Sequence, residues 1–357
     1  MAAIHSPAHS PAQAPAQAPV PELLKPTTLR ELVGWPGPCI TVLLSPDHNG
    51  EGSGARRAYV KSSVLAAEQQ LAQRGCPKTA RANLLAPLEQ LAVDPLFAGC
   101  SAWSEVIFAS PGVFRQFSLT QPVKARLIAG GSFSVRQLVA ELERPRVFYV
   151  LSLSKSQVAL MRCAGLHSEM IKPPAGVPDR GAENQSEFYR LVDRGLQQLL
   201  HEPWTPLILA GGAEDLAVYR AGSVYRDLIP ESMAGSAGKA LEQTETLQQA
   251  YCILRADHHR REAAALLAAK ERTAPGRLST DADTILHAAF EGRVSQLYVN
   301  ERAERIDMFE RGSYQSWGSE DLYNLAAVQT ILHHGKACFL PANLMPNREM
   351  AAAFMRF

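Results

Sequence analysis

Apolar residues recur at three- and four-residue spacing over residues 281–290, which is the period of a helix with one buried face. Ser279 or Thr280 is the predicted cap of this helix, because a side-chain oxygen there can accept a backbone N–H of the first turn. Gly292 is the predicted end of the helix. The apolar run at 294–299 that follows predicts a strand.

A second helix and two more strands continue this pattern to the end of the chain. Ser319 is the predicted cap of that helix, with Glu320 and Asp321 in its first turn. The short apolar runs at 337–340 and 351–357 predict two strands. We therefore expect the chain to end inside a sheet.

The first third of the chain has the pattern of an α/β unit. A buried strand is predicted at residues 39–44, followed by one helix at 55–73 and another from residue 78 onward. The two strands of a hairpin are predicted at 104–109 and 113–119. Pro77 favours the start of the second helix through its fixed φ. The Pro111–Gly112 turn between two alternating runs is the hairpin signal.

The pattern changes after residue 145, where a nearly continuous apolar run predicts a strand covered on both faces. A hairpin should follow at residues 157–163 and 166–171, and a helix at 188–199. A second buried strand is expected at 206–210 and a bridging helix at 240–272. No proline interrupts the bridging helix, so one continuous rod is expected. The loop 172–183 and the small-residue segment 229–239 are expected to be mobile.

Three segments carry a resemblance to a known family: HAAFEGRVSQLYVNE, DLYNLAAVQTILHHGKACFLP and MPNREMAAAFMRF. They are similar to the C-terminal domain of a third bacterial family of the archaeo-eukaryotic peptide-chain release factor superfamily. The resemblance implies an α/β (α+β) fold class and a three-domain release-factor-like architecture. It further implies a ribonuclease-H-like middle domain and a C-terminal α/β sandwich similar to ribosomal proteins that bind kink-turn RNA.

This architecture and the pattern together predict four segments. Residues 1–26 are predicted to form a disordered Pro/Ala-rich tail, and residues 27–145 an N-terminal α/β domain. Residues 146–272 are predicted to form a middle release-factor-like domain that includes the bridging helix, and residues 273–357 a C-terminal ribosomal-protein-like domain. With 357 residues and 46% hydrophobic content, the chain is large enough to give each of the three domains a core.

The amino-acid composition restricts the kinds of partner that the protein is expected to bind. Lys plus Arg number 36 against 35 for Asp plus Glu, so a nucleic-acid partner would require a local cluster of positive charge. The six cysteines are scattered, which is typical of reduced thiols in the cytoplasm and indicates neither a disulfide framework nor a zinc site. No apolar run is long enough for a membrane span, so we expect a cytoplasmic protein without a membrane partner.

Release factors of the superfamily carry a Gly-Gly-Gln loop just before a helix, and the resemblance places DRGAENQSEFYRLVDRG at that position. This segment lacks the tripeptide, and its nearest counterparts are Arg180, Gly181, Asn184, Gln185 and Ser186. Glu183–Asn184 replaces the paired glycines, although non-glycine residues cannot freely adopt φ > 0. Three interpretations stay open: Gln185 is a catalytic candidate, the loop contacts the ribosome without this chemistry, or Asn184 caps the helix after an exposed loop.

Two groups of basic residues are candidates for binding anions. The RNA-binding candidates lie on the bridging helix and just after it, and are Arg255, Arg260, Arg261, Lys270, Arg272 and Arg277. Glu262 and Glu271 dilute their charge, so a solvated helix face is the alternative. Arg56 and Arg57 follow a glycine-rich stretch at a predicted helix start and are candidates for binding a smaller anion, with a flexible loop as the alternative.

Other chemistry finds little support in the sequence. Adjacent helical residues point about 100° apart, so His258–His259 and His333–His334 cannot each share an ion, and we predict no metal. Gly211–Gly212 is followed by acids rather than a Walker lysine, so no nucleotide or other cofactor is predicted. The middle strands lack the carboxylates of a two-metal nuclease, and the chain has no G-x-S-x-G elbow.

These patterns and the resemblance lead to one functional hypothesis and two alternatives. We expect a bacterial, cytoplasmic, translation-associated protein that binds the ribosome or a structured RNA, in rescue, hibernation or stress response, without hydrolysing peptidyl-tRNA through a Gly-Gly-Gln loop. Other proteins are possible partners, while DNA and membranes are not expected. The first alternative is a protein-interaction scaffold of the same fold without RNA binding, which the near-neutral charge favours. The second is a hydrolase with an unrecognised site.

Overall fold

The computed structural model describes most of the chain after residue 25. The described residues are 26–33, 35, 37–46, 52–94, 103–155, 157–172, 185–200, 205–234, 243–274, 276–311, 314–315 and 320–357. Residues 1–25 of the expected tail, nearly all of the loop 172–183, and the expected cap Ser319 lie outside them, while Pro26, the last residue of that tail, is described and begins a helix.

The first sheet has the antiparallel order β3-β2-β1-β4. Its strands are β1 (Cys39–Leu44), β2 (Ser104–Ser110), β3 (Val113–Leu119) and β4 (Arg126–Gly130). The helices α2 (Gly52–Gln73) and α3 (Lys78–Val93) share one core with this sheet, and α1 (Pro26–Val33) and α4 (Arg136–Leu142) share another. Ser110 pairs with Val113 across the β2–β3 turn, where Gly112 has φ +80°, so the predicted hairpin is confirmed.

The middle sheet has the order β7-β6-β5-β8-β9, in which β5, β8 and β9 are parallel. Its strands are β5 (Val147–Leu153), β6 (Val158–Ala164), β7 (His167–Ile171), β8 (Leu207–Gly211) and β9 (Leu228–Ala234). The helices α5 (Gln185–Leu199) and α6 (Ala213–Gly222) cover one face, and α7 (Gln243–Arg272) covers the other. Phe148 packs towards α7 and Leu151 towards α5, so β5 is covered on both faces as predicted.

One expectation for this part was wrong. Residues 229–234 belong to strand β9 rather than to a mobile segment. Ile229 and Met233 are buried, and both lie in the core that α7 closes. Backbone pairing with β8 and this burial outweigh the weak strand preference of the small residues. Residues 235–239 lie outside the described part.

The last sheet has the order β10-β17-β11-β16, and β11 and β16 are parallel. Its strands are β10 (Leu278–Ser279), β11 (Val294–Asn300), β16 (Lys336–Leu340) and β17 (Ala351–Met355). The helices α8 (Ala282–Phe290) and α9 (Leu322–Leu332) pack on one face, and the second half of α7 packs on the other. Strand β17 lies between β10 and β11, so the chain does end inside a sheet.

Short elements surround this sheet. They are the ribbon of β12 (Ile306–Asp307) with β15 (Glu320–Asp321), the ribbon of β13 (Glu310–Arg311) with β14 (Tyr314–Gln315), and the 3-10 turn η2 (Pro346–Arg348).

Both helix caps expected in this part were assigned to the wrong residue. Asp281 caps α8 by accepting the Thr284 N–H at 2.8 Å, and Asp321 caps α9 by accepting the Tyr323 N–H at 3.2 Å. The preceding residues are held in strands: Ser279 belongs to β10, and Glu320–Asp321 pair with β12. A carboxylate at the cap also complements the positive end of the helix dipole.

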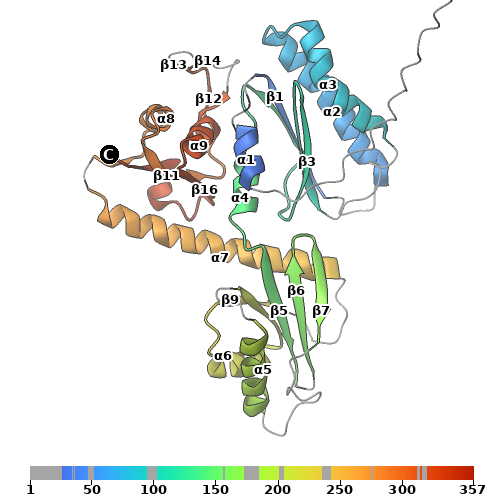
Figure 1. The fold of residues 1–357 in the computed structure, drawn as a ribbon, viewed down its shortest axis with the longest axis vertical. Helices are drawn as coiled ribbons and strands as arrows, with labels where there is room; N and C mark the ends of the chain where they lie inside the picture. The colour runs from blue at the N-terminus through green and yellow to red at the C-terminus, as the bar shows by residue number, and fades with distance from the viewer. Residues whose placement is uncertain are drawn as a thin grey trace, which may run out of the picture.

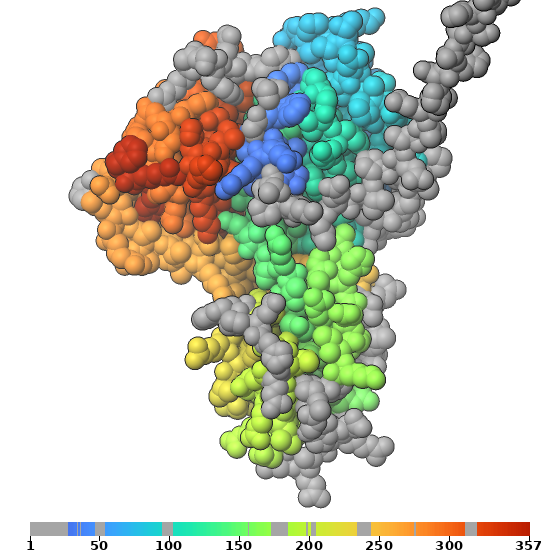
Figure 2. Space-filling view, viewed as in Figure 1, coloured from blue at the N-terminus to red at the C-terminus, as the bar shows by residue number. Residues whose placement is uncertain are grey.

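The first and last sheets share one hydrophobic core, although they are far apart in the sequence. This core combines Phe108 and Phe133 from the first part with Ile285, Leu325 and other residues of the last part. Figure 1 shows these two parts side by side, with α7 running along them to the middle part below. Figure 2 shows the same division as a broad body joined to a narrower one. The α/β fold class predicted from the sequence is confirmed, and α7 is continuous over its 30 residues.

Candidate functional site

Gln185 is the first residue of α5, and its amide is engaged inside the middle part. Its Nε2 donates a hydrogen bond to the carboxylate of Asp215 on α6 and another to Tyr189 Oη at 3.3 Å. Tyr189 Oη donates to the same carboxylate oxygen at 2.8 Å. Burial, reinforced by Asp215 and opposed by the Gln185 hydrogen bond, raises the pKa of Tyr189 to about 12, so the phenol remains a donor at neutral pH.

This network holds the glutamine against α6 rather than presenting its amide to solvent. Asp215 is 8% exposed, so it requires the donors that Gln185 and Tyr189 supply. Ser186 is the exposed second residue of α5. Arg180, Gly181 and Asn184 lie outside the described residues, so the role of the loop as a whole stays a prediction.

Four of the six RNA-binding candidates have side-chain partners, while Arg272 donates only to the backbone carbonyl of Ala268 at 3.0 Å. Arg260 forms ion pairs with Glu231 and Asp257, and Arg261 with Asp227 and Asp257. Lys270 binds Glu349 Oε2 at 2.6 Å, and Arg255 donates to Gln121 Oε1 at 3.5 Å. The positive charge of the middle of α7 is therefore largely compensated by nearby carboxylates.

The other two candidates face solvent. Arg272 and Arg277 are exposed, and neither has a carboxylate partner among the described residues. The backbone carbonyl of Arg277 accepts the Met355 N–H at 2.8 Å, next to Arg356, and the Arg356 N–H donates to the carbonyl of Arg293 at 2.7 Å. Three arginines therefore meet at one edge of the last sheet. We call Arg277, Arg293 and Arg356 the arginine edge.

The two candidates near the start of α2 are used within the first part. Arg56 is buried and forms an ion pair with Glu105 at 2.7 Å. Arg57 Nη2 donates to the backbone carbonyl of Asp94 at 3.1 Å, beyond the end of α3. Both side chains hold α2 to its neighbours in this structure.

A polar cavity of about 260 Å³ lies between the first and last parts. Its lining combines strand β4 and the start of α4 with residues 301–306 and 320–324. Arg136 lines this cavity and joins the two parts, because its guanidinium donates to Asp321 Oδ2 at 2.7 Å and to the backbone carbonyl of Ala303 at 2.9 Å. Arg126 forms a second, more exposed ion pair across the same boundary with Glu304.

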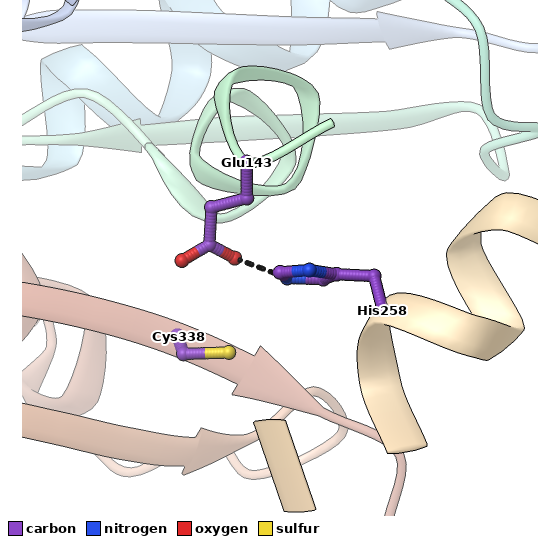
Figure 3. A group of neighbouring side chains, drawn as sticks. All are labelled: Glu143, His258 and Cys338. Atoms are coloured by element: carbon purple, nitrogen blue, oxygen red, sulfur yellow. Dashed lines mark hydrogen bonds and ion pairs between the residues drawn. The ribbon is translucent and has the colours of Figure 1, made fainter. Parts of the chain in front are cut away.

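A group of side chains with metal-ligand atoms lies where α4, α7 and β16 meet (Figure 3). It consists of Glu143, His258 and Cys338, and we call it the junction cluster. Their ligand atoms all lie within 4.8 Å of one another, and His258 Nε2 is 3.0 Å from Glu143 Oε2. Among the described residues, this is the one group of three such side chains that could hold a metal ion.

The comparisons with known proteins agree with the resemblance seen in the sequence. Residues 178–293 match the model of the family described as bacterial archaeo-eukaryotic release factor family 3. This is the family that the resemblance in the sequence indicated. The match to this release factor family covers about a third of the chain, from residue 178, before α5, to residue 293, just before β11. No curated protein matches the sequence.

Several solved structures resemble the chain weakly. An archaeal translation termination factor is 15% identical, with 94% of this chain and 99% of that chain covered and a TM-score of 0.26. Pelota from Archaeoglobus fulgidus is 15% identical, with coverages of 72% and 80% and a TM-score of 0.40. Dom34 from S. cerevisiae is 11% identical, with coverages of 68% and 73% and a TM-score of 0.34. At these TM-scores the likeness supports no argument about this chain.

The sequence reasoning did not find the junction cluster. It tested His258 only against His259 and not against Glu262, which follows four residues later and lies on the same side of α7. That i, i+4 spacing was the available signal. Glu143 and Cys338 could not be associated with it, because they approach α7 only through the packing of three separate segments.

No helix in the described part of the chain is both long enough and apolar enough to cross a membrane.

Proposed function

We propose that this chain is a translation-associated, release-factor-like protein of the cytoplasm that binds the ribosome or a structured RNA and does not hydrolyse peptidyl-tRNA through a glutamine amide. The match to the release factor family supports the association with translation. The observation that carries the absence of hydrolysis is the engagement of Gln185 with Asp215. Rescue, hibernation and stress response differ in when such a protein binds, and the family match leaves these three open.

Engagement of the glutamine matters because a catalytic amide must orient a water molecule at the reacting ester. In this chain both hydrogens of the Gln185 amide are directed to partners of the middle part, Asp215 and Tyr189. Freeing them would leave the buried Asp215 carboxylate without one of its donors. The internal network therefore opposes the geometry that hydrolysis requires.

We place the RNA contact at Arg272, Arg277 and the arginine edge. This placement is supported by exposure, because Arg272, Arg277 and Arg356 face solvent, while the arginines in the middle of α7 are paired with carboxylates. Arg293, the remaining residue of the arginine edge, is half-buried and already paired with Glu291. An exposed arginine can bind a phosphate without first breaking an internal ion pair. Binding through this edge would present the last sheet and the end of α7 to the RNA.

Co-sedimentation with ribosomes across a salt series tests this proposal. Arg272→Ala/Arg277→Ala should lower the slope of log affinity against log salt by about 1.8 for duplex RNA and about 1.4 for single strands. Lys61→Ala/Lys78→Ala is the matched control, because it removes two exposed charges from α2 and α3 and changes net charge equally. Equal slopes in both variants would exclude this surface, and no binding of the wild type under slow growth, stress or stalling would exclude the function.

The scaffold alternative has one specific observation in its favour. The ion pairs of Arg260, Arg261 and Lys270 leave no continuous positive face along the middle of α7. A chain that binds proteins but no RNA would show this pattern together with a salt-independent interaction. Binding of a protein partner unaffected by both double substitutions, with no ribosome in the sedimented fraction, would support it.

A further inference from the structure

The junction cluster lies at the point where all three parts of the molecule meet. Glu143 follows the last residue of helix α4 in the first part and is the C-cap of that helix. His258 lies on α7, at the place where that helix passes from the middle sheet to the last sheet. Cys338 lies on β16 of the last sheet. Figure 3 shows the three side chains converging from these elements.

The side chains have the chemistry of a transition-metal site. A thiolate, an imidazole and a carboxylate together are ligands that Zn²⁺ accepts, with bonds of about 2.0–2.3 Å in a tetrahedral arrangement. Ligand atoms at such bond lengths lie roughly 3.3–3.8 Å apart. The present separation of 3.0 Å between Glu143 and His258 would lengthen slightly, and the wider separations of at most 4.8 Å within the group would contract modestly.

The charges around the cluster are suited to a cation. Glu143 and Glu262 supply two negative charges, and Lys336 supplies one positive charge, with its Nζ 2.7 Å from Glu262 and 4.0 Å from Glu143. Although burial lowers the pKa of Lys336, Glu262 and then Glu143 raise it above its ordinary value, so the amine remains charged. Adding Zn²⁺ and ionising Cys338 would bring the sum of these charges to zero, as a buried site requires.

A second carboxylate beside the cluster has an unused oxygen. Glu262 Oε1 accepts a hydrogen bond from Lys336, while its buried Oε2 has no well-formed hydrogen bond among the described residues, although burial and then Glu262 raise the pKa of the nearby Tyr298 hydroxyl. An unpaired buried carboxylate oxygen is costly and is often explained by an ion or water at that place. Glu262 lies one turn of α7 beyond His258, on the same side of the helix.

We propose that Glu143, His258 and Cys338 bind one Zn²⁺ ion. The three side chains leave the fourth tetrahedral position open, next to the second carboxylate, Glu262. Binding releases the Cys338 proton to solvent as the S–Zn bond forms, and no electron is transferred. Burial and then Glu143 raise the pKa of this thiol, so zinc affinity should increase with pH.

The ion would act as a crosslink between segments that are distant in the sequence. Glu143 and His258 are separated by 115 residues, and Cys338 lies in a third element. A bound ion that joins them stabilises the arrangement of α4 and β16 against α7, because the unfolded chain offers no preformed site. The orientation of the middle part relative to the rest would then depend on the metal.

Metal analysis of the full-length, untagged protein tests the proposal. Protein purified without chelator should contain about one zinc per chain by mass spectrometry, and Cys338→Ser and His258→Asn should each contain a tenth of that or less. Cys252→Ser and His334→Asn are matched controls, because they remove an exposed cysteine and an exposed histidine outside the cluster. The controls should keep the wild-type zinc content.

Two measurements on the wild type guard against variants that fail to fold. Cobalt added to the metal-free protein should produce thiolate-to-cobalt charge-transfer absorption, and zinc should raise the melting temperature by about 5 °C or more. Absence of zinc in the purified protein together with no cobalt absorption would overturn the proposal. Zinc binding that survives in the folded Cys338→Ser protein would overturn the ligand assignment.

Discussion

Removing the charge of Arg136 should destabilise the junction between the first and last parts of the chain. This arginine starts α4, is 11% exposed, and reaches into the last part. Its guanidinium donates to three backbone carbonyls and one carboxylate and lies over an aromatic ring, the partners being Asn300, Glu301, Ala303, Asp321 and Phe339. Arg136→Met keeps most of the apolar stem and removes all of these hydrogen bonds.

The expected loss of unfolding free energy is about 3 kcal/mol. Breaking a buried ion pair costs about 3–5 kcal/mol, because one charge remains in the interior without its partner. Asp321 is 17% exposed and still accepts the backbone N–H groups of Arg305 and Tyr323, at 3.3 and 3.2 Å. These remaining donors place the cost at the lower end of that range.

Arg126→Met provides a matched control, since Arg126 joins the same two parts through Glu304. The side chains of this pair are 50% and 38% exposed, so solvent screens their attraction. Exposed pairs contribute about 0.2–1 kcal/mol, and we expect the control to lose about 0.5 kcal/mol. The two variants differ in burial and remove the same residue type.

Urea unfolding at fixed pH, followed by circular dichroism, measures both free energies. The slopes with denaturant must agree among the three proteins for the comparison to hold. Hydrogen exchange should also increase in α4 and α9 of the Arg136→Met protein. A loss below about 1 kcal/mol for Arg136→Met, equal to that of the control, would refute the argument that burial makes this contact strong.

Three further predictions concern charged and polar side chains that have partners inside the protein or are buried. Arg260→Ala/Arg261→Ala should change the salt slope of RNA binding by less than about one unit in the same co-sedimentation assay, because both arginines already neutralise carboxylates; a decrease near 1.8 would contradict this. Gln185→Ala should lower the unfolding free energy by about 1–2 kcal/mol in urea and leave peptide release at background, since the buried Asp215 loses a donor; wild-type release activity abolished by this substitution would show a catalytic glutamine. Burial, and then the charges of His258 and Arg255, lower the pKa of His259 to about 4. The unfolded chain then binds the proton first, so stability is fully present above about pH 6.5 and declines as the pH falls towards 4. His259→Gln should flatten this decline in melting temperature, and an unchanged decline would assign it to other groups.

The elements predicted with a clear period agree with the structure. The β2–β3 hairpin, the double-sided strand β5 and the continuous helix α7 all follow from patterns a few residues long. Periodicity reports which side of an element is buried, and this is a local property of the chain. Caps were harder to predict, since Ser279 competes with Asp281 for the same helix and only strand pairing decides between them.

The candidate sites depended on information that the pattern does not contain. The sequence placed several basic residues on α7. Asp257 lies on the same helix, but the further partners Glu231, Asp227 and Glu349 come from other elements. Whether an arginine faces an RNA or a carboxylate is therefore decided by packing. The same holds for Gln185, whose amide is oriented by Asp215 at the start of a different helix.

The sequence by itself determined the elements with a clear hydrophobic period, the α/β class and the similarity to a release factor family, because hydrophobic periods and segment similarity are properties of contiguous residues. It did not predict β4, α4 or β9. Tertiary structure decided which distant residues meet. The shared core of the first and last parts and the junction cluster both join segments more than one hundred residues apart. Such contacts form only when whole sheets and helices bury their apolar faces against one another, and the side chains brought together at those boundaries are not encoded by any local period.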